Sequence, residues 1–232
     1  MTDERASRAT EAFWGRRRGK TLKPLQAKAL AAAKRGLFVN TSEKAPSELW
    51  ALFDHQPTSV HLEIGFGSGE HLLAHALRRP EVGFLGVEPF VNSLAKMAAA
   101  TQEAKVSNIR FYDDDATQLL DWLPPASVDG IDLFYPDPWP KPKHWKRRFV
   151  SQKNLDRFAR VMKPGALFRF ASDIDTYVNW TLQHVAQRDD FEWLVTDANS
   201  WRTPYEHWVR TRYEAKAVRE GRTSCYLIFR RT

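Results

Sequence analysis

Residues 60–69, VHLEIGFGSG, decide how this 232-residue chain folds. The apolar run at 60–64 predicts a buried strand, and the glycines after it predict a tight turn into a helix at 70–77. Such a turn lets the backbone approach a ligand closely and presents the helix N-terminal amides to it. The spacing is G-x-G-x-G, whereas dinucleotide-binding folds favour G-x-G-x-x-G.

Strand and helix patterns alternate on the carboxyl-terminal side of this turn. Further strands are expected at 83–87, 109–112, 128–134, 166–171, 192–195 and 224–229, and helices at 92–104, 151–162 and 175–187. The alternation predicts an α/β fold with a doubly wound, mostly parallel seven-stranded sheet and helices on both faces. The last strand is reached without a crossover helix, so it is expected to be antiparallel.

The formal net charge of +7 is concentrated at the N-terminus. Residues 1–44 hold eleven Lys or Arg against four Asp or Glu, with RRRGK at 16–20 as the centre, whereas the rest of the chain holds 24 of each sign. We therefore divide the chain into a basic, partly flexible arm at 1–44 and a folded domain at 45–232. A basic arm is typical of a protein that binds a polyanion, although a solubilising tail has the same composition.

The composition also indicates in which cellular compartment the protein works. The single cysteine, Cys225, excludes an internal disulfide and fits a reducing compartment. No apolar stretch approaches the ~20 residues needed to span a bilayer, and the N-terminus has no secretory apolar segment. The sequence therefore predicts a soluble, cytoplasmic protein that does not bind membranes.

Three acids stand at the ends of successive predicted strands around the glycine turn. Glu63 precedes the first glycine by two residues, Glu88 ends the second strand and Asp115 follows the third. Glu63 would repel a pyrophosphate but suits a ligand with an ammonium group, such as the methionine part of S-adenosylmethionine. Glu88 is placed to bind ribose hydroxyls, and Asp115 could bind the adenine amino group. Each acid alone could be a surface or capping residue, but together they indicate a cofactor site.

A proline-rich loop follows the strand expected at 128–134. Residues 135–142 read YPDPWPKP and continue into KHWKRR at 143–148. Alternating prolines cannot continue a strand, so this loop is held rigid at the sheet edge where open α/β folds bind ligands. Asp137 can accept hydrogen bonds from a base, Trp139 can stack on it and the cations can hold phosphates. We interpret the loop as a nucleobase site, and a solvated surface loop is the alternative.

Four segments together resemble the bacterial tRNA (guanine-N7)-methyltransferase family of class I, Rossmann-like S-adenosylmethionine-dependent methyltransferases. They are EIGFG at 63–67, PDPW at 136–139 with its KHWKRR tail, ASD at 171–173 and TRYE at 211–214. The resemblance covers nearly everything from 15 to 230 and identifies 45–232 as the methyltransferase domain. It implies methyl transfer from S-adenosyl-L-methionine to N7 of guanine-46 in the tRNA variable loop. It also implies tRNA as the partner, and we infer no obligate protein partner.

The resemblance assigns roles to individual positions. It implies that the cofactor is bound by Glu63, Gly65, Gly67, Glu88, Asp115 and Asp137, of which Asp137 is also catalytic. It implies that substrate is bound by Lys141, Asp173, Thr211, Arg212, Tyr213 and Glu214. Lys143, Lys146, Arg147 and Arg148 are expected to contact RNA phosphates, and no metal is expected. Pro140, Pro142 and Tyr213 replace a common His, a basic residue and a usual Phe of the family, departures that concern loop geometry more than activity.

Guanine N7 carries a lone pair and no proton, so its methylation needs no general base. Asp137 and Asp173 are expected to orient the guanine and to complement its developing positive charge. Asp173 could instead cap the helix at 175, and Thr211 with Glu214 could form a capping box. Two other functions stay open: an exocyclic amino-group nucleic-acid methyltransferase, whose acid-Pro-Pro-aromatic loop resembles residues 137–139, and a non-catalytic RNA-binding protein.

Overall fold

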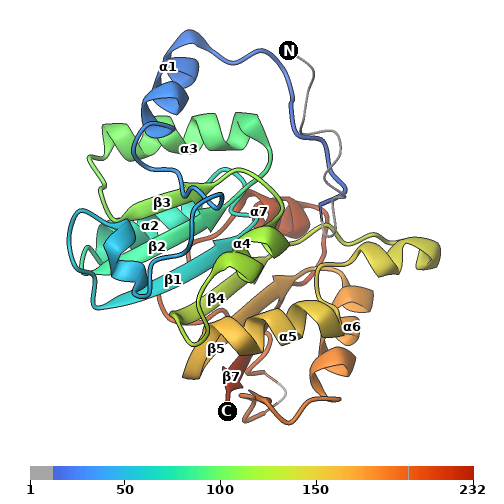
Figure 1. Cartoon of the computed structure of the whole chain (residues 1–232). Helices are drawn as coiled ribbons and strands as arrows, with labels where there is room; N and C mark the ends of the chain where they lie inside the picture. Colours follow the sequence, from blue (N-terminus) through green and yellow to red (C-terminus); the bar gives the residue numbers. More distant parts are fainter. Residues whose placement is uncertain (1–12, 198) are drawn as a thin grey trace.

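The computed structural model describes residues 13–197 and 199–232 (Figure 1). Within them one sheet has the strand order β3-β2-β1-β4-β5-β7-β6. The strands are β1 (Ser59–Ile64), β2 (Val82–Val87), β3 (Ile109–Tyr112), β4 (Val128–Phe134), β5 (Met162–Ser172), β6 (Phe191–Trp193) and β7 (Cys225–Arg231). Strand β7 pairs antiparallel with β5 and β6, and the other pairs are parallel. The predicted seven-stranded sheet with an antiparallel last strand is therefore confirmed.

Helices cover both faces of this sheet (Figure 1). One face carries α4 (Ala116–Trp122), α5 (Gln152–Val161) and α6 (Asp175–Val185), and the other carries α2 (Glu70–Arg78), α3 (Val91–Glu103) and α7 (Arg212–Arg219). The larger core, on the α5 side, includes Leu62, Ile131 and Phe168. A second core under α2 and α3 is built around Phe84 and Leu72. Burial of apolar side chains on both faces is what holds a mostly parallel sheet together.

Local chemistry explains where several elements begin and end. Helix α4, which the sequence patterns did not predict, starts where the Asp115 carboxylate accepts a hydrogen bond from the Thr117 amide at 2.9 Å. Helix α5 stops at Val161 and β5 starts at the next residue, four residues before the expected start at 166. Gly165 takes a φ of +82° there, which a side chain would disfavour.

The described part of the basic arm packs on the rest of the protein. Helix α1 (Pro24–Ala33) lies on α3 and buries Ala29, Leu30 and Ala33 (Figure 1). Phe38 forms a parallel bridge with Phe111, next to the outer edge of β3. Residues 13–44 therefore line one side of the molecule, and residues 1–12 of the predicted arm lie outside the described residues. None of the described helices is both long and apolar enough to span a membrane.

Candidate functional site

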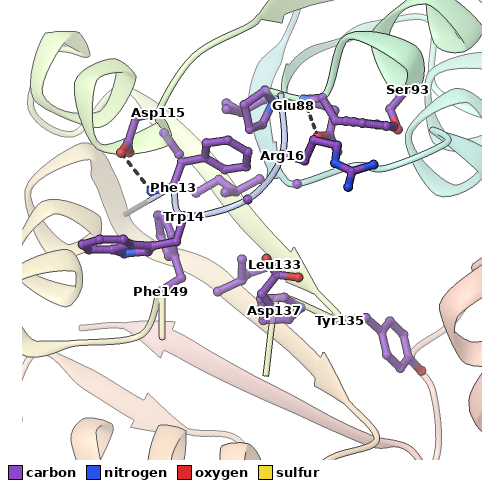
Figure 2. A pocket seen from close by; sticks show the side chains of 18 of the residues that line it. Phe13, Trp14, Arg16, Glu88, Ser93, Asp115, Leu133, Tyr135, Asp137 and Phe149 are labelled. Atoms are coloured by element: carbon purple, nitrogen blue, oxygen red, sulfur yellow. Dashed lines mark hydrogen bonds between the residues drawn. The ribbon is translucent and has the colours of Figure 1, made fainter. Parts of the chain in front are cut away.

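A cavity of about 330 Å³ opens at the carboxyl ends of the central strands (Figure 2). It lies where the chain order reverses between β1 and β4, the place where open α/β sheets bind ligands. Seven separate stretches of the chain meet there. Its lining includes Phe13, Trp14, Arg16, Gly65, Glu88, Phe90, Asp115, Tyr135, Asp137, Trp139, Arg147, Phe149, Arg212 and Tyr213.

Glu88 is held by backbone donors at the end of β2. Its Oε2 accepts a hydrogen bond from the Gly67 amide at 2.8 Å and its Oε1 accepts one from the Phe90 amide at 2.9 Å. Burial raises the pKa of this carboxyl to about 7, against the opposing effect of the two amides. Gly67 has a φ of +57°, and a Cβ there would lie 3.3 Å from Cε2 of Tyr213. The glycine turn therefore supports Glu88 and gives the Tyr213 ring room to pack over it.

Asp115 ties together α4, the cavity wall and the arm. Its Oδ1 accepts hydrogen bonds from the Thr117 amide and hydroxyl at 2.9 and 2.8 Å, and its Oδ2 accepts one from the Phe13 amide at 3.0 Å. Figure 2 shows the Phe13 bond at one side of the cavity. Arg17 pairs with the neighbouring Asp114 at 2.6 Å. The start of the described chain is thus fastened over the site by two consecutive acids.

The proline-rich loop is held in an unusual backbone conformation. Tyr135 and Trp139, on either side of the Pro-Asp-Pro stretch, have φ values of +50° and +44°, a region that bulky residues rarely enter. The Asp137 side chain points into the cavity (Figure 2), and partial removal from water raises the pKa of its carboxyl. Among the described residues it has no hydrogen-bonding partner. Such strain collects at functional sites, so the loop geometry indicates that Asp137 meets a ligand.

Arg147 lies between two indole rings at the cavity mouth. Its guanidinium carbon is 4.9 Å from the ring centroid of Trp14 and 4.9 Å from that of Trp139, within cation–π range. The predicted RNA-contacting residues Lys143 and Lys146 are exposed, as is Lys141. These cations border the cavity without entering it. A polyanion that approaches the cavity from this side meets them first.

Arg148, by contrast, is a correction to the sequence analysis. It is only 2 % exposed. Its guanidinium donates to the carbonyl of Pro138 at 3.0 Å and to the carbonyl and hydroxyl of Thr176 at 2.7 and 3.0 Å, and it packs on the Tyr177 ring. A buried side chain with these partners cannot reach an RNA phosphate. Arg148 instead fastens the proline-rich loop to α6.

Glu63 also lies away from the cavity. The lining includes its neighbours Ile64 and Gly65 but not Glu63, whose Oε2 accepts a hydrogen bond from His71 Nδ1 at 2.8 Å. The side chain is on the face of β1 that α2 covers, and it is 6 % exposed. The carboxylate expected at the ammonium group of a cofactor therefore has a protein partner on the other side of the strand.

The predicted substrate residues separate into two groups. Arg212 and Tyr213 line the cavity, whereas Asp173 pairs with Arg222 at 2.5 Å. The capping interpretation of Asp173 is wrong, because the N-cap of α6 is Ile174.

The TRYE segment at 211–214 contains half of a capping box. The Thr211 hydroxyl accepts a hydrogen bond from the Glu214 amide at 3.1 Å, as expected of an N-cap. The Glu214 carboxylate does not accept the reciprocal hydrogen bond from the Thr211 amide that completes a capping box. It is 4 % exposed and accepts from the Tyr226 hydroxyl and from Trp208 Nε1, both at 2.6 Å. Thr211 and Glu214 therefore place α7, and Glu214 lies too deep to meet a substrate.

Sequence reasoning missed the apolar part of the cavity. Phe13, Trp14, Phe90 and Phe149 line it. Phe13 and Trp14 stand one glycine before the basic block at 16–18, and this aromatic-plus-basic pairing was the one signal that could have pointed to them. Phe149 and Phe90 carry no such signal, because isolated aromatic residues are more often core.

The fold and the cavity together define a class I methyltransferase. Two solved structures share the fold, a 16S rRNA methyltransferase (17% identity, TM-score 0.54, covering 82% of this chain and 95% of that one) and an antibiotic-related methyltransferase (16% identity, TM-score 0.52, covering 84% and 99%). The model of a family described as "Putative methyltransferase" matches residues 57–227.

Curated relatives narrow the class to a family. The tRNA (guanine-N(7)-)-methyltransferase of Agrobacterium fabrum is 61% identical over 99% of both chains. That of Mesorhizobium japonicum is 60% identical over 97% of both, and that of Rhizobium meliloti is 60% identical over 100% of both. This chain belongs to the tRNA (guanine-N7)-methyltransferase family.

Proposed function

We propose that this protein transfers a methyl group from S-adenosyl-L-methionine to N7 of a guanine in the tRNA variable loop, guanine-46. One observation carries the proposal. The Asp137 carboxylate, which has no partner among the described residues, stands in a nucleoside-sized cavity beside Glu88 and Asp115, in a chain whose full-length relatives bear that activity in their names. Because tRNA is a cytoplasmic molecule, we place the reaction in the cytoplasm.

The cavity residues fit the cofactor. Glu88 keeps acceptor capacity beyond its two amide bonds, and its carboxyl, with a pKa of about 7, suits ribose hydroxyls in its ionised form. Asp115 Oδ2 accepts from the Phe13 amide at the cavity wall, and an adenine amino group could donate to it beside Phe13 or in its place. The turn at Gly65 leaves its backbone open to the ligand, because no atom lies within 4 Å of the point where a Cβ would stand. Bound there, the cofactor supplies an electrophilic methyl group.

This chain's own contribution to the reaction is orientation and charge. N7 attacks through a lone pair, so no side chain has to remove a proton. The Asp137 carboxylate orients the base and stabilises the positive charge that develops on it, in a loop whose geometry is set before the substrate arrives. The rigid loop matters because preorganised charges cost no rearrangement at the moment of reaction.

The basic residues supply affinity for the RNA backbone. Lys141, Lys143 and Lys146 on one side of the cavity and Arg16, Arg18 and Lys20 of the arm on the other are exposed. Contacts of this kind hold phosphates without reading sequence. We assign residues 1–44 to this arm and 45–232 to the methyltransferase domain, with substrate choice resting on tRNA shape and on a base extruded into the cavity.

The direct test is to incubate the protein with labelled S-adenosylmethionine and tRNA and to identify the methylated nucleoside. We expect 7-methylguanosine, and reduction followed by aniline should cleave the tRNA at the variable loop. A matched transcript with adenine at position 46 should accept no label. N6-methyladenosine, N2-methylguanosine or the absence of methylation would exclude the proposal.

A further inference from the structure

A chain of buried polar side chains runs beneath α2 on the face of the sheet away from α5. Glu63 on β1 accepts a hydrogen bond from Nδ1 of His71 on α2, and Nε2 of His71 bonds the Tyr205 hydroxyl. Glu63 and His71 are 6 % and 2 % exposed. Tyr205 lies 134 residues beyond His71 in the sequence. The chain therefore connects the strand before the glycine turn with a distant segment of the protein.

The carboxylate determines how His71 presents itself to Tyr205. A carboxylate accepts hydrogen bonds, so Nδ1 must carry the proton that it donates to Glu63. In the neutral ring Nε2 is then the acceptor, and the Tyr205 hydroxyl donates to it. Carboxylates fix histidine tautomers in this way at metal sites as well. Without Glu63, the proton could move to Nε2 and the ring could no longer accept from Tyr205.

A neighbouring ion pair neutralises the other buried carboxylate of this region. Asp132 stands beside Glu63 in the β1–β4 register, and its two carboxylate oxygens accept from Arg169 at 2.6 and 2.7 Å. Glu63, His71 and Asp132 lie close enough to hold a metal ion, with ligand atoms within 4.8 Å of one another. The Arg169 guanidinium already supplies the positive charge there and packs 4.3 Å from the Tyr205 ring centroid. The group is therefore a structural clamp on Tyr205.

The segment that Tyr205 anchors has little structure of its own. Residues 201–211 contain no helix or strand, so ladder hydrogen bonds do not fix them. The Tyr205 carbonyl accepts from the Trp208 amide at 3.1 Å, and the two rings meet edge to face at 5.2 Å. Trp208 in turn donates to Glu214 on α7. The segment leads directly into α7, whose Arg212 and Tyr213 line the cavity.

We propose that Glu63 is a positioning residue: it acts through His71 and Tyr205 to hold residues 201–211, and hence the substrate-side residues of α7, against the sheet. It does not touch the cofactor. The proposal deepens the proposed function, because it rests on tRNA being the substrate that this segment and α7 receive. The carboxylate next to the glycine turn, Glu63, would then position residues that bind the RNA substrate and would not itself bind the cofactor.

Three substitutions test this: Glu63→Leu, which removes the acceptor for His71 at similar side-chain size, Tyr205→Phe and the double variant. We expect cofactor affinity by calorimetry to stay within about twofold of wild type in all three, and the KM for tRNA to rise roughly fivefold in each with little change in kcat. The double variant should equal the larger single effect, because both changes break one chain of contacts. Hydrogen exchange at the Trp208 amide should accelerate in all three, a readout that needs no tRNA.

The matched control is Tyr112→Phe, which removes a hydroxyl hydrogen-bonded to Gln118 outside the cavity lining. It should leave the KM for tRNA and the exchange at Trp208 unchanged. Tenfold weaker cofactor binding in Glu63→Leu, with normal exchange at Trp208, would overturn the proposal and make Glu63 a cofactor ligand. Additive effects of the two single changes would overturn it as well. Failure of wild-type protein to methylate tRNA would instead refute the proposed function, and the exchange result would still decide whether Glu63 holds residues 201–211.

Discussion

Two pairs of carboxylates, which stand in comparable sequence motifs, have different surroundings in the fold. Glu88 and Asp137 follow strand ends and face the cavity, whereas Glu63 and Glu214, which belong to equally distinctive motifs, are buried with protein partners. The first pair keeps acceptor capacity for a ligand. The second pair uses it on His71, Trp208 and Tyr226. A motif therefore marks residues that the site needs, but it does not distinguish a residue that touches a ligand from one that places its neighbours.

The basic tail of the proline-rich loop repeats this contrast between adjacent residues. Arg147 lies between Trp14 and Trp139 at the cavity mouth, and Arg148 is buried against Thr176 and Pro138. One residue along an irregular backbone reverses the direction of a side chain. Of the two arginines in the run KRR, Arg147 therefore faces the ligand side and Arg148 packs in the protein interior.

The largest effect is expected from the cavity-facing set. Asp137→Asn should lower the single-turnover rate roughly 100- to 1,000-fold, equivalent to about 3–4 kcal/mol, since it removes charge where the guanine becomes cationic. Cofactor and tRNA affinities should change less than about threefold. Glu192→Gln, on the exposed edge strand β6, is the control and should react normally. A full rate in Asp137→Asn would make the loop only a structural clamp.

Arg148→Ala should reduce the free energy of unfolding by about 2–3 kcal/mol, because it removes a buried guanidinium that donates three hydrogen bonds to Pro138 and Thr176 and packs on the Tyr177 ring. Arg147→Ala should cost less than about 1 kcal/mol and should instead weaken tRNA binding and reduce the salt slope by at most about one unit. Urea unfolding and filter binding over a salt series measure the two effects. Equal stability losses in both variants would remove the contrast between the two arginines.

Glu88 should make cofactor binding depend on pH. Its carboxyl has a pKa of about 7, and only the ionised form accepts fully from ribose hydroxyls, so binding favours loss of the proton. Affinity should therefore rise as pH increases, by about tenfold from pH 6 to pH 8, and then level off. Calorimetry at several pH values measures this, and Glu88→Gln should flatten the curve while lowering affinity throughout. A flat wild-type curve would show that Glu88 does not bind the cofactor as a carboxylate.

The smallest effect is expected at the start of α7. Thr211→Ala removes the N-cap bond to the Glu214 amide and should cost about 1 kcal/mol of stability, whereas Thr211→Ser should restore it. If Thr211 only caps the helix, the whole effect of its removal should appear as lower stability in thermal unfolding. The KM for tRNA should then change only in the variant that has lost stability. A raised KM in the serine variant at wild-type stability would show that the Thr211 methyl group meets the substrate.

The sequence by itself determined the architecture and the edge of the sheet that holds the site. Apolar runs alternating with helical patterns predict the seven strands, and the turn at 65–69 with the loop at 135–142 marks the carboxyl ends of β1 and β4. These are local signals, since the periodicity of side chains and the limits of Gly and Pro depend only on neighbouring residues. Helix α4 was not predicted because its seven residues are too few to show a helical period.

Only the tertiary structure decided which predicted residues face the cavity. The Glu63 side chain lies away from the cavity because it is hydrogen-bonded to His71, which in turn bonds to Tyr205. The Phe13 amide donates to Asp115, which lies 102 residues away in the sequence. Arg148 is buried because Thr176 and Pro138 offer it acceptors that the sequence does not place beside it. The physical reason is that a buried polar side chain must find a partner, and that partner comes from wherever the fold brings an acceptor or donor within reach.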